Sequence, residues 1–455
     1  MSKPSIPQGM RDFSAETVRK RNHILSVIRQ VFECYGFEPL ETPAMENIET
    51  LMGKYGEEGD KLIFKVLNNG LNDPKNEEKA RAGFQKVMEG KSSADLTGRA
   101  LKYDLTIPFA RFVAMNHGQL TFPYKRYQIQ PVWRADRPQK GRYREFTQCD
   151  ADVAGSRSLV NEVELALIYD QVFRKLGLHG YELRINNRKI LAALANRCGG
   201  AEFLTDITVA IDKLDKIGLD KVLEELRQRG LQENQIDSIR QYLSISGSNA
   251  EKIQAIQTLL GDDPQAIKGL EELSFVLEHA SGAQLVADFT LARGLNYYTG
   301  VIFEVRPPNT VTMGSIGGGG RYDDLTGLFG VKDISGVGIS FGIDRIYDVM
   351  EELQLFPNSM SAGTHALFFN MGDTESLTAF RLVTKLREQQ IPCELYHEPA
   401  KMDKQFKYAE KKNIPYAVII GSHEIAEQKA MVKDLTTGKQ EAVPFEKLKP
   451  FFKPS

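Results

Sequence analysis

The densest group of residues able to carry chemistry lies in a short basic segment, residues 134–144. It contains five basic residues and one acidic residue, Asp136, so its local charge is about +4 in a chain whose net charge is −2. The basic residues are Arg134, Arg137, Lys140, Arg142 and Arg144. Because a planar guanidinium forms paired, charge-assisted hydrogen bonds with phosphate oxygens, this clustering indicates a phosphate-binding loop. A solvated basic hairpin tip is the structural alternative.

Hydrogen-bond acceptors follow the basic segment at every second position. Gln148, Asp150 and Asp152 alternate along an expected strand, and side chains two residues apart on a strand point to the same face. Such a face can hold an ammonium group or an imidazole N–H. Arginines for phosphate beside carboxylates for a small cation suggest a site that joins a nucleotide to an amino-bearing substrate. For any one carboxylate, the alternative is an exposed salt bridge of little energetic value.

Two further segments carry arginines that lack an obvious structural role. In LARGLNYYTG, Arg293 has no local acidic partner, and Tyr297 and Tyr298 are expected on opposite faces of a strand. A tyrosine hydroxyl can hydrogen-bond a substrate ring, although a single tyrosine is more often a core residue. In GISFGIDR, a helix is expected to carry Arg345 in its first turn, where a cation opposes the helix dipole. Phosphate binding would account for a cation there.

The segment LKYDLTIPFAR places Asp104 and Thr106 at alternating positions on an expected extended stretch, so both can point into one pocket. The glycine cluster GSIGGGGRYDD contains neither a Walker loop nor the dinucleotide fingerprint. It indicates a tight turn that allows close backbone approach to a ligand or a partner strand. The seven histidines are scattered and no nucleophile–base pair is apparent, which disfavours covalent catalysis.

The elements expected to position these residues follow from hydrophobic spacing. Helices are predicted over residues 14–35 and 159–176, and antiparallel strands with a long hairpin between residues 101 and 153. The polar segment 68–97 is predicted to form an inserted loop or short surface helices. Residues 188–280 are predicted to form a separate helical insertion. After a Pro/Ser/Gly-rich stretch, strands alternate with helices, which predicts a small α/β domain with a largely parallel sheet.

Length and composition limit the class of protein. A chain of 455 residues with 42% hydrophobic and 26% charged residues is expected to fold into roughly three globular domains. Its near-neutral charge requires that any polyanion be met by a local patch. No membrane-spanning stretch or secretory signal is recognisable, and the four cysteines lie far apart without metal or disulfide spacing. We therefore expect a cytoplasmic protein with no membrane partner and no resident metal.

Seven motifs spread along the chain are similar to those of a known family. PQGMRDF, GFEPLETP, YDLTIPFAR, WRADRPQKGRYREFTQCDADVAG, LARGLNYYTG, GGGGRYDDL and GISFGIDR together resemble the histidyl-tRNA synthetases, a family of class II aminoacyl-tRNA synthetases. The resemblance implies an α+β catalytic domain with an antiparallel class II sheet, formed by residues 1–187 and 281–355. It also implies a helical insertion domain over 188–280 and an anticodon-binding α/β domain over 362–455.

The resemblance also implies a role for individual residues. It makes Arg134 and Arg293 the catalytic arginines on the ATP α-phosphate, and Phe146 and Arg345 the pair that sandwiches adenine. Arg137 and Gln139 would contact the acceptor end of tRNA. The residues implied to bind histidine are Asp104, Thr106 and Gln148 at its α-amino group, Asp152, Tyr297 and Tyr298 at its imidazole, and Arg134 and Arg293 at the reacting end.

Further expectations follow from the same resemblance. The partners would be L-histidine, ATP carrying Mg²⁺, histidine tRNA and a second copy of the chain. A non-enzymatic relative, the synthetase-like regulatory subunit of ATP phosphoribosyltransferase, is the alternative, but it lacks the C-terminal domain. Two positions depart from the family pattern: Asp136 replaces a common Glu, and Asn296 a common Asp. The segment 68–97 is also longer than the usual connection.

Overall fold

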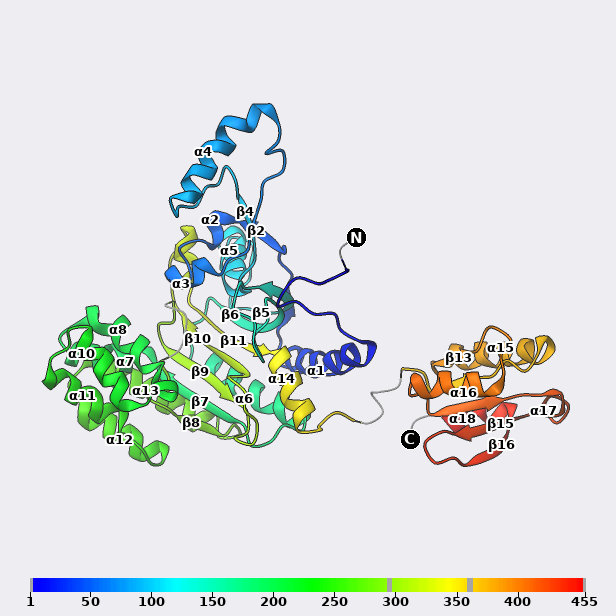
Figure 1. Cartoon of the computed structure of the whole chain (residues 1–455). Helices are drawn as coiled ribbons and strands as arrows, with labels where there is room; N and C mark the ends of the chain where they lie inside the picture. The colour runs from blue at the N-terminus through cyan, green and yellow to red at the C-terminus, as the bar shows by residue number, and fades with distance from the viewer. Residues whose placement is uncertain (1–2, 293–296, 358–362, 453–455) are drawn as a thin grey trace. The chain divides into compact units, whose positions relative to one another are not determined.

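In a computed structural model of the chain, eight strands drawn from residues 38–342 form one sheet (Figure 1). All neighbouring strands are antiparallel except the two edge pairs, β1 with β5 and β7 with β8. This confirms the expected antiparallel sheet. In spatial order the strands are β1 Glu38–Pro39, β5 Tyr124–Trp133, β6 Glu145–Ala154, β11 Gly336–Gly342, β10 Gly317–Tyr322, β9 Val301–Arg306, β7 Glu182–Asn187 and β8 Leu285–Ala287.

The structure describes residues 3–292, 297–357 and 363–452. They fall into two units, residues 1–11 with 23–355 and residues 12–22 with 356–455. The eight-stranded sheet belongs to the first unit. Among the described residues, no helix has both the length and the apolar character needed to cross a membrane.

Strands β5 and β6 form the predicted long hairpin around the basic loop. Their register sets Arg126 opposite Asp152 and Gln130 opposite Gln148. Along β6 the side chains alternate in character, because Gln148, Asp150 and Asp152 are separated by small apolar residues that are fully buried (Cys149 and Ala151). One face of the hairpin therefore joins the apolar core, and the other presents polar groups inside the protein.

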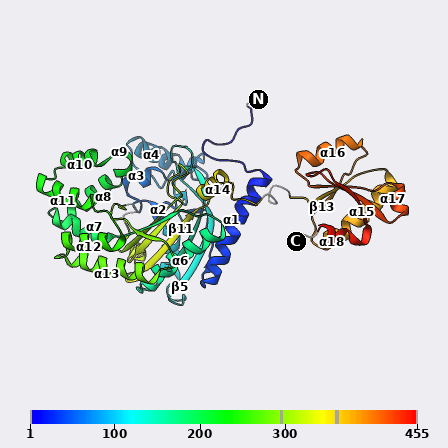
Figure 2. The same cartoon turned by 90° about the horizontal axis from the view of Figure 1, so that it is seen from below.

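Helices lie along the large sheet (Figure 2), and aromatic side chains pack two of them against it. Phe341 of β11 packs against Phe32 of α1 (Ala15–Cys34) and against Tyr169 and Phe173 of α6 (Val160–Lys175), with ring centroids 5.8, 4.7 and 5.7 Å away. The Tyr169 hydroxyl also lies 2.9 Å from a backbone carbonyl oxygen of β10 and from one of β11, and shares its single proton between them. Helix α6 therefore ties neighbouring strands together as well as covering them.

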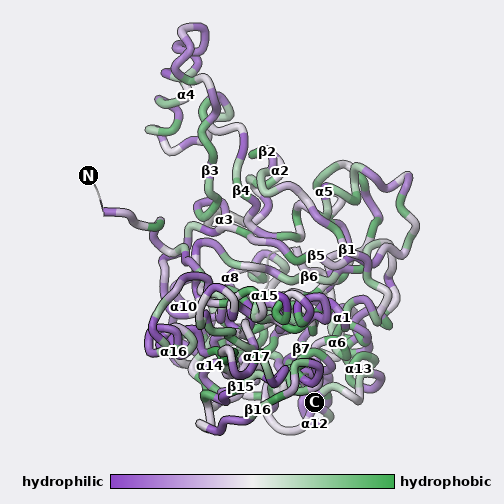
Figure 3. The backbone as a smooth tube through the Cα atoms, turned by 90° about the vertical axis from the view of Figure 1, so that its right-hand side faces the viewer, coloured by the Kyte–Doolittle hydropathy of each residue, from purple (hydrophilic) through white to green (hydrophobic). Residues whose placement is uncertain are grey.

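The segment over residues 68–97 is an arm built around one helix. A three-stranded sheet, β2 (Met45–Asn47), β4 (Arg99–Leu101) and β3 (Lys65–Val66), carries it. Beyond that sheet, α4 (Glu77–Met88) projects away from the large sheet in Figure 1, and Figure 3 shows hydrophilic and hydrophobic stretches alternating along it. The short surface helices expected here are represented by the 3-10 turn η1 (Pro74–Asn76) and by α4.

The chain between β7 and β8 contains only helices, as expected for the helical segment. They pack on one another and on β7, for example α13 against α7. In order they are α7 Arg188–Arg197, η2 Ala201–Phe203, α8 Leu204–Ile211, α9 Leu214–Ile217, α10 Leu219–Gln228, α11 Glu233–Leu243, α12 Asn249–Leu260 and α13 Pro264–His279. The remaining elements of the first unit are α2 Ile48–Leu51, α3 Gly56–Lys61, α5 Thr106–Asn116, η3 Leu325–Phe329 and α14 Ile343–Glu352.

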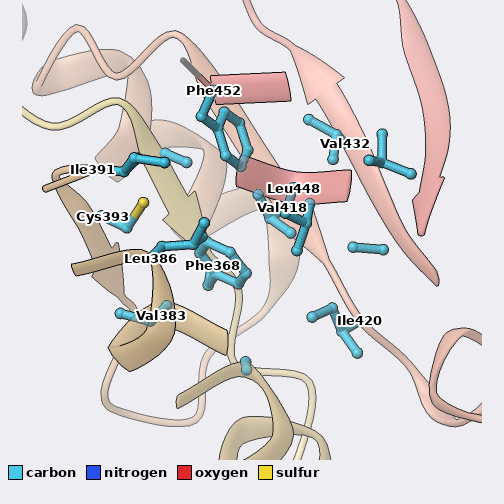
Figure 4. Packing of buried hydrophobic residues seen from close by; sticks show 14 residues of the cluster. Phe368, Val383, Leu386, Ile391, Cys393, Val418, Ile420, Val432, Leu448 and Phe452 are labelled. Carbon is cyan, nitrogen blue, oxygen red and sulfur yellow. The ribbon is translucent and has the colours of Figure 1, made fainter. Parts of the chain in front are cut away.

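The second unit has a five-stranded sheet with an apolar core that includes Phe368, Val418 and Phe452 (Figure 4). The expected parallel pairing holds for three strands, β13–β12–β14. The last two strands form an antiparallel hairpin instead, because Asp434 Oδ1 accepts hydrogen bonds from the amides of Thr436 and Thr437 and closes a tight turn. The elements are β12 Ala366–Phe368, α15 Asp373–Glu388, β13 Cys393–Leu395, α16 Met402–Lys411, β14 Tyr416–Ile419, α17 Ser422–Ala426, β15 Lys429–Asp434, β16 Gln440–Pro444, η5 Phe445–Lys447 and α18 Leu448–Phe452.

The glycine cluster lies in strand β10 and not in the expected turn. A Cβ on Gly319 would lie 2.1 Å from the carbonyl oxygen of Gly338 and 2.7 Å from Cα of Ile339, both backbone atoms of β11. Close backbone approach to a partner strand, which the sequence indicated, is therefore the reason for glycine at this position.

We expect Gly319→Ala to destabilise the first unit by about 3 kcal/mol, because the added methyl meets backbone that cannot move aside. The midpoint of thermal unfolding should fall by several degrees. Gly118→Ala is the matched control, since no atom lies within 4 Å of the Cβ it would add. Equal midpoints for the two variants would contradict the close packing of β10 on β11.

Candidate active site

Two adjoining cavities open on the polar face of the large sheet. The larger one has a volume of about 470 Å³ and the smaller one about 80 Å³. Arg134, Gln148, Gly318 and Ser340 line both cavities and form their boundary. Other residues of the larger cavity include Tyr103, Asp136, Arg142, Phe146, Asp344 and Arg345. Those of the smaller cavity include Asp104, Thr106, Asp150, Asp152, Tyr297, Tyr298 and Tyr322.

Arg134 lies at this boundary, directly after the last residue of β5. Its Nε donates a 3.0 Å hydrogen bond to the carbonyl oxygen of Tyr103, and its guanidinium carbon lies 4.3 Å from the Tyr103 ring centroid and 5.1 Å from that of Phe146. Among the described residues no carboxylate forms an ion pair with Arg134. Its positive charge is therefore held in place by a carbonyl and two rings and stays available to an anion.

Arg345 lies in the larger cavity, where the sequence predicted a strand-to-helix junction. Strand β11 ends at Gly342 and α14 begins at Ile343, so Arg345 falls in the first helical turn as expected. Its Nε donates to the carbonyl of Gly141 (2.8 Å) and its Nη1 to the carbonyl of Ser315 (2.7 Å). These two bonds hold the guanidinium plane against the cavity wall, the geometry needed to stack on a planar ring.

A second charged contact secures the wall of the larger cavity. Arg11 forms an ion pair with Asp344, which also accepts a 3.3 Å hydrogen bond from the Thr147 amide. The Arg11 guanidinium lies 3.2 Å from the centroid of the Tyr143 ring, and burial raises the pKa of that tyrosine. The N-terminal segment is thereby fixed to β6, α14 and the basic loop together.

In the smaller cavity, Asp152 is paired with a cation and a hydroxyl, although its Oδ2 has no hydrogen-bond partner. Its Oδ2 lies 2.8 Å from Nη2 of Arg126, and its Oδ1 accepts a 2.6 Å hydrogen bond from the Tyr322 hydroxyl. Arg126 is fully buried and its guanidinium lies 4.2 Å from the centroid of the Phe109 ring. Burial raises the pKa of Asp152, and the positive charge of Arg126 opposes that rise.

Asp104 and Thr106 both line the smaller cavity, although the extended segment expected for them is wrong. Thr106 begins helix α5, and Pro108 is tolerated because it stands in the first turn. Asp104 Oδ1 accepts from the Tyr55 hydroxyl (2.9 Å) and from the amide of Ile107 (3.1 Å), whereas its buried Oδ2 has no hydrogen-bond partner. Burial raises the pKa of Asp104.

Two more acceptors of the smaller cavity are unpaired. Gln148 donates from Nε2 to the Ser340 hydroxyl (3.3 Å), which leaves its Oε1 without a partner. Asp150 is 3% exposed, and its Oδ1 also has no hydrogen-bond partner. Burial raises the pKa of Asp150 to about 7, against the opposing charge of Arg126 and with help from Asp152. Buried unpaired acceptors are rare and point to a ligand that carries donors.

Tyr297 and Tyr298 both line the smaller cavity, so the expected opposite orientation is wrong. They precede strand β9, which begins only at Val301, and side chains outside a strand need not alternate. Their ring centroids are 5.0 Å apart in an edge-to-face arrangement. Burial, together with the charges of Asp152 and Asp150, raises the pKa of Tyr298, so its hydroxyl remains a hydrogen-bond donor.

The two cavities differ in charge. Three carboxylates face the smaller cavity, and the only cation paired with them in the described residues is Arg126. The larger cavity contains three arginines, two carboxylates that are each paired with an arginine, aromatic rings and glycine backbone. The smaller cavity therefore suits a small ligand with positive charge and N–H donors, and the larger one suits an anion attached to a flat ring. No group of three or more His, Cys, Asp or Glu side chains in the described residues is arranged to hold a metal ion.

Two predicted site residues that the structure describes, Arg137 and Gln139, line neither cavity. Arg293 lies outside the described residues. Arg137 and Gln139 are exposed on the loop between β5 and β6, where Gln139 forms an isolated bridge with Arg142. They are accessible to a macromolecule but line neither cavity.

Sequence reasoning missed three residues that shape the smaller cavity: Arg126, Tyr55 and Tyr322. Arg126 could have been found from the sequence, because pairing the two strands of the predicted hairpin in register sets it opposite Asp152. No comparable signal existed for the two tyrosines, which reach Asp104 and Asp152 from distant parts of the chain.

Comparison with known proteins gives a consistent result. The family model for histidyl-tRNA synthetase matches residues 77–346, and the family model for the anticodon binding domain matches residues 367–454. A histidine–tRNA ligase of Flavobacterium johnsoniae is 52% identical over 468 residues, covering 98% of each chain. That of Christiangramia forsetii is 53% identical, covering 97% of this chain and 98% of its own. The histidyl-tRNA synthetase structure from Nostoc sp. PCC 7120 has a TM-score of 0.82 at 30% identity, with 99% of both chains covered.

The antiparallel sheet, its two cavities and the appended anticodon-binding domain are those of a class II aminoacyl-tRNA synthetase. Within that class, the identities of about half over nearly the whole length are decisive. The chain belongs to the histidyl-tRNA synthetase family.

The unpaired buried carboxylate has a measurable consequence for stability. Folding raises the pKa of Asp150 from 3.8 to about 7, so the folded chain binds a proton that the unfolded chain releases. Stability is therefore lost as pH rises from about 4 to 7. Arg126, Asp152, Asp104 and the Ser340 hydroxyl, which act on Asp150 from neighbouring elements, are already included in that shift.

We expect Asp150→Asn to stabilise the unliganded protein at pH 8 by up to about 4 kcal/mol, because it removes a buried charge. The gain should shrink steadily as pH is lowered towards 5. Thermal unfolding of the variant and the wild type across pH 5–8 measures this, with Asp333→Asn, an exposed carboxylate, as the control. A variant that is less stable at pH 8, or a gain independent of pH, would contradict the assignment.

Proposed function

We propose that the chain activates L-histidine with ATP to form histidyl-adenylate and pyrophosphate, and then transfers histidine to the 3′ end of its cognate tRNA. The observation that carries this proposal is the pair of adjoining cavities with opposite electrostatic character, joined at Arg134 and Gln148. A nucleotide in the larger cavity and an amino acid in the smaller one would bring their reacting ends together at this boundary.

ATP would occupy the larger cavity. Phe146 and Arg345 would sandwich adenine, and Arg134 would bind the α-phosphate, with Arg293 reaching it from the other side. The fixed guanidinium of Arg134, bonded to a carbonyl and flanked by two rings, supports this role. Mg²⁺ would enter bound to ATP and leave with pyrophosphate.

Histidine would occupy the smaller cavity. Asp104, Thr106 and Gln148 would bind the α-amino group, and Asp152 and Tyr298 the imidazole, with Tyr297 beside them. The free oxygens of Asp104 and Gln148 support the first assignment, since an ammonium group has three donors to share. Buried polar groups of this kind reject isosteres that lack the matching hydrogen-bond groups.

The chemistry requires orientation and charge, not an enzyme nucleophile. The histidine carboxylate attacks the α-phosphorus in line, a new P–O bond forms, and the bond to pyrophosphate breaks. The arginines stabilise the negative charge that grows on the α-phosphate oxygens in the transition state. A ribose hydroxyl of the tRNA 3′ end then attacks the histidyl carbonyl and releases AMP.

Residues outside the cavities would serve tRNA and assembly. We assign Arg137 and Gln139 to the acceptor end, and their exposure supports contact with a large partner. We also propose a catalytic domain of residues 1–187 and 281–355, a helical insertion of residues 188–280 and an anticodon-binding domain of residues 362–455. A homodimer, a cytoplasmic location and the absence of a membrane partner stay predictions.

The regulatory-subunit alternative is disfavoured. Relatives that match nearly the whole chain at about half identity are histidine–tRNA ligases. The anticodon-binding domain, which that class of subunit lacks, matches residues 367–454. Arg134 and Arg345 are also both present in the larger cavity.

The central test is histidine-dependent ATP–pyrophosphate exchange by the full chain. We expect exchange with L-histidine and Mg²⁺-ATP, and a loss of about 10²- to 10³-fold in kcat for Arg134→Ala, because its partner charge develops in the transition state. Arg157→Ala, an exposed arginine outside both cavities, is the control and should keep the wild-type rate. Folded wild-type protein that shows no exchange with histidine would refute the proposed function.

Arg137→Ala should separate the two half-reactions. Because Arg137 lies outside both cavities, exchange should proceed at the wild-type rate, while aminoacylation of histidine tRNA should be slowed about tenfold or more by the loss of a charge-assisted contact. Equal losses in both assays would place Arg137 in the adenylation step instead.

The proposed homodimer is tested by light scattering of the purified chain at micromolar concentration. We expect a mass of twice the 51.1 kDa of one chain. A monomeric mass in the preparation that is active in exchange would rule out a required dimer.

A further inference from the structure

We propose that Asp150 is a further specificity-determining residue, whose free Oδ1 accepts a hydrogen bond from the imidazole N–H of the substrate. The inference rests on the proposed function. It adds a second carboxylate, beside Asp152, to the end of the smaller cavity that reads the ring.

The position of Asp150 along β6 favours the ring over the amino group. Successive residues of a strand advance about 3.3 Å, so Gln148, Asp150 and Asp152 form three levels on one face. Gln148 lines both cavities and marks the level at which the substrate carboxylate must meet ATP, whereas Asp150 and Asp152 line only the smaller cavity. The amino group, which is carried by the carbon next to the carboxylate, belongs at the level of Gln148, and the ring belongs deeper.

The ion pairs of the carboxylates also favour Asp150. Asp152 is held by Arg126 and Tyr322, so its charge is balanced by a cation, although its Oδ2 has no hydrogen-bond partner. Asp150 has no ion-pair partner in the described residues, although it is 3% exposed and lines the cavity. Leaving a buried acceptor oxygen unpaired lowers the stability of the folded protein. A structural role does not explain such a cost, whereas a ligand that donates to this oxygen does.

Asp150, which would share the ring N–H with Asp152, and Tyr298 together match the two nitrogens of a neutral imidazole. The carboxylate can only accept from the ring N–H, and the tyrosine hydroxyl, kept protonated by its surroundings, can donate to the other nitrogen. Both side chains line the same small cavity. A ring that lacks either group would leave one of them unpaired.

The experiment compares two variants, Asp150→Asn and Asp150→Ala, in pyrophosphate exchange by the full chain. The probes are L-histidine, 3-(imidazol-4-yl)propanoate, which lacks the amino group, and β-(2-thienyl)-L-alanine, which lacks the ring nitrogens. We expect KM for histidine and the inhibition constant of the propanoate to rise together by about 10- to 100-fold, as for loss of a hydrogen bond to a charged group. The inhibition constant of thienylalanine should change less than twofold.

Three outcomes would overturn the inference. Weaker thienylalanine binding with unchanged propanoate binding would assign Asp150 to the amino group. No change with any probe would make the residue structural, and so would equal weakening of all three. Asp333→Asn is the exposed-carboxylate control, and thermal unfolding confirms that each variant is folded. If the wild type shows no exchange with histidine, the proposed function is refuted. If the wild type is active and both Asp150 variants match it with every probe, only the inference about Asp150 is refuted.

Discussion

The buried ion pair between Arg126 and Asp152 is the constraint on which the rest of the site depends. Arg126 is fully buried and carries the only cation paired with a carboxylate of the smaller cavity among the described residues. Removing either partner would leave an uncompensated charge in the sheet, at a cost of about 3–5 kcal/mol. The register of the β5–β6 hairpin sets Arg126 opposite Asp152 and therefore fixes the position of the buried cation that can balance negative charge. Asp104, Asp150 and Gln148 line the same cavity as Asp152.

Strands β10 and β11 carry glycines where they pass beneath the side chains of the site, because a larger residue there would collide with those side chains. A Cβ on Gly338 would lie 1.9 Å from Oδ1 of Asp152, and one on Gly320 would lie 2.9 Å from the Tyr298 ring. Side chains on β10 and β11 would thus fill the space that the carboxylate and the tyrosine occupy. The glycine run that suggested a turn is in fact the part of the sheet where two strands leave room for ligand-binding side chains from their neighbours.

Local patterns predicted the parts of the site that one element creates. Alternation found the acceptor face of β6, basic clustering found Arg134, and the strand-to-helix junction found Arg345. The sequence did not reveal what distant elements contribute: Tyr55 and Tyr322 reach the carboxylates across long separations, and Tyr297 and Tyr298 share a cavity because they precede their strand. The extended prediction for Asp104 and Thr106 is wrong because helix α5 begins at Thr106, with Pro108 in its first turn, where proline is tolerated.

The three carboxylates of the smaller cavity lower the stability of the fold but favour binding of a cationic ligand. In the unliganded protein the raised pKa values of Asp104, Asp150 and Asp152 record the free energy lost by burying negative charge. A cationic ligand with several N–H donors would supply the missing hydrogen-bond partners. A ligand without those donors would leave the acceptors unpaired, so the site selects for the first kind of ligand. A core optimised only for stability would replace Asp150 with a neutral side chain. Its retention as an unpaired buried acid is therefore best explained by what binds beside it.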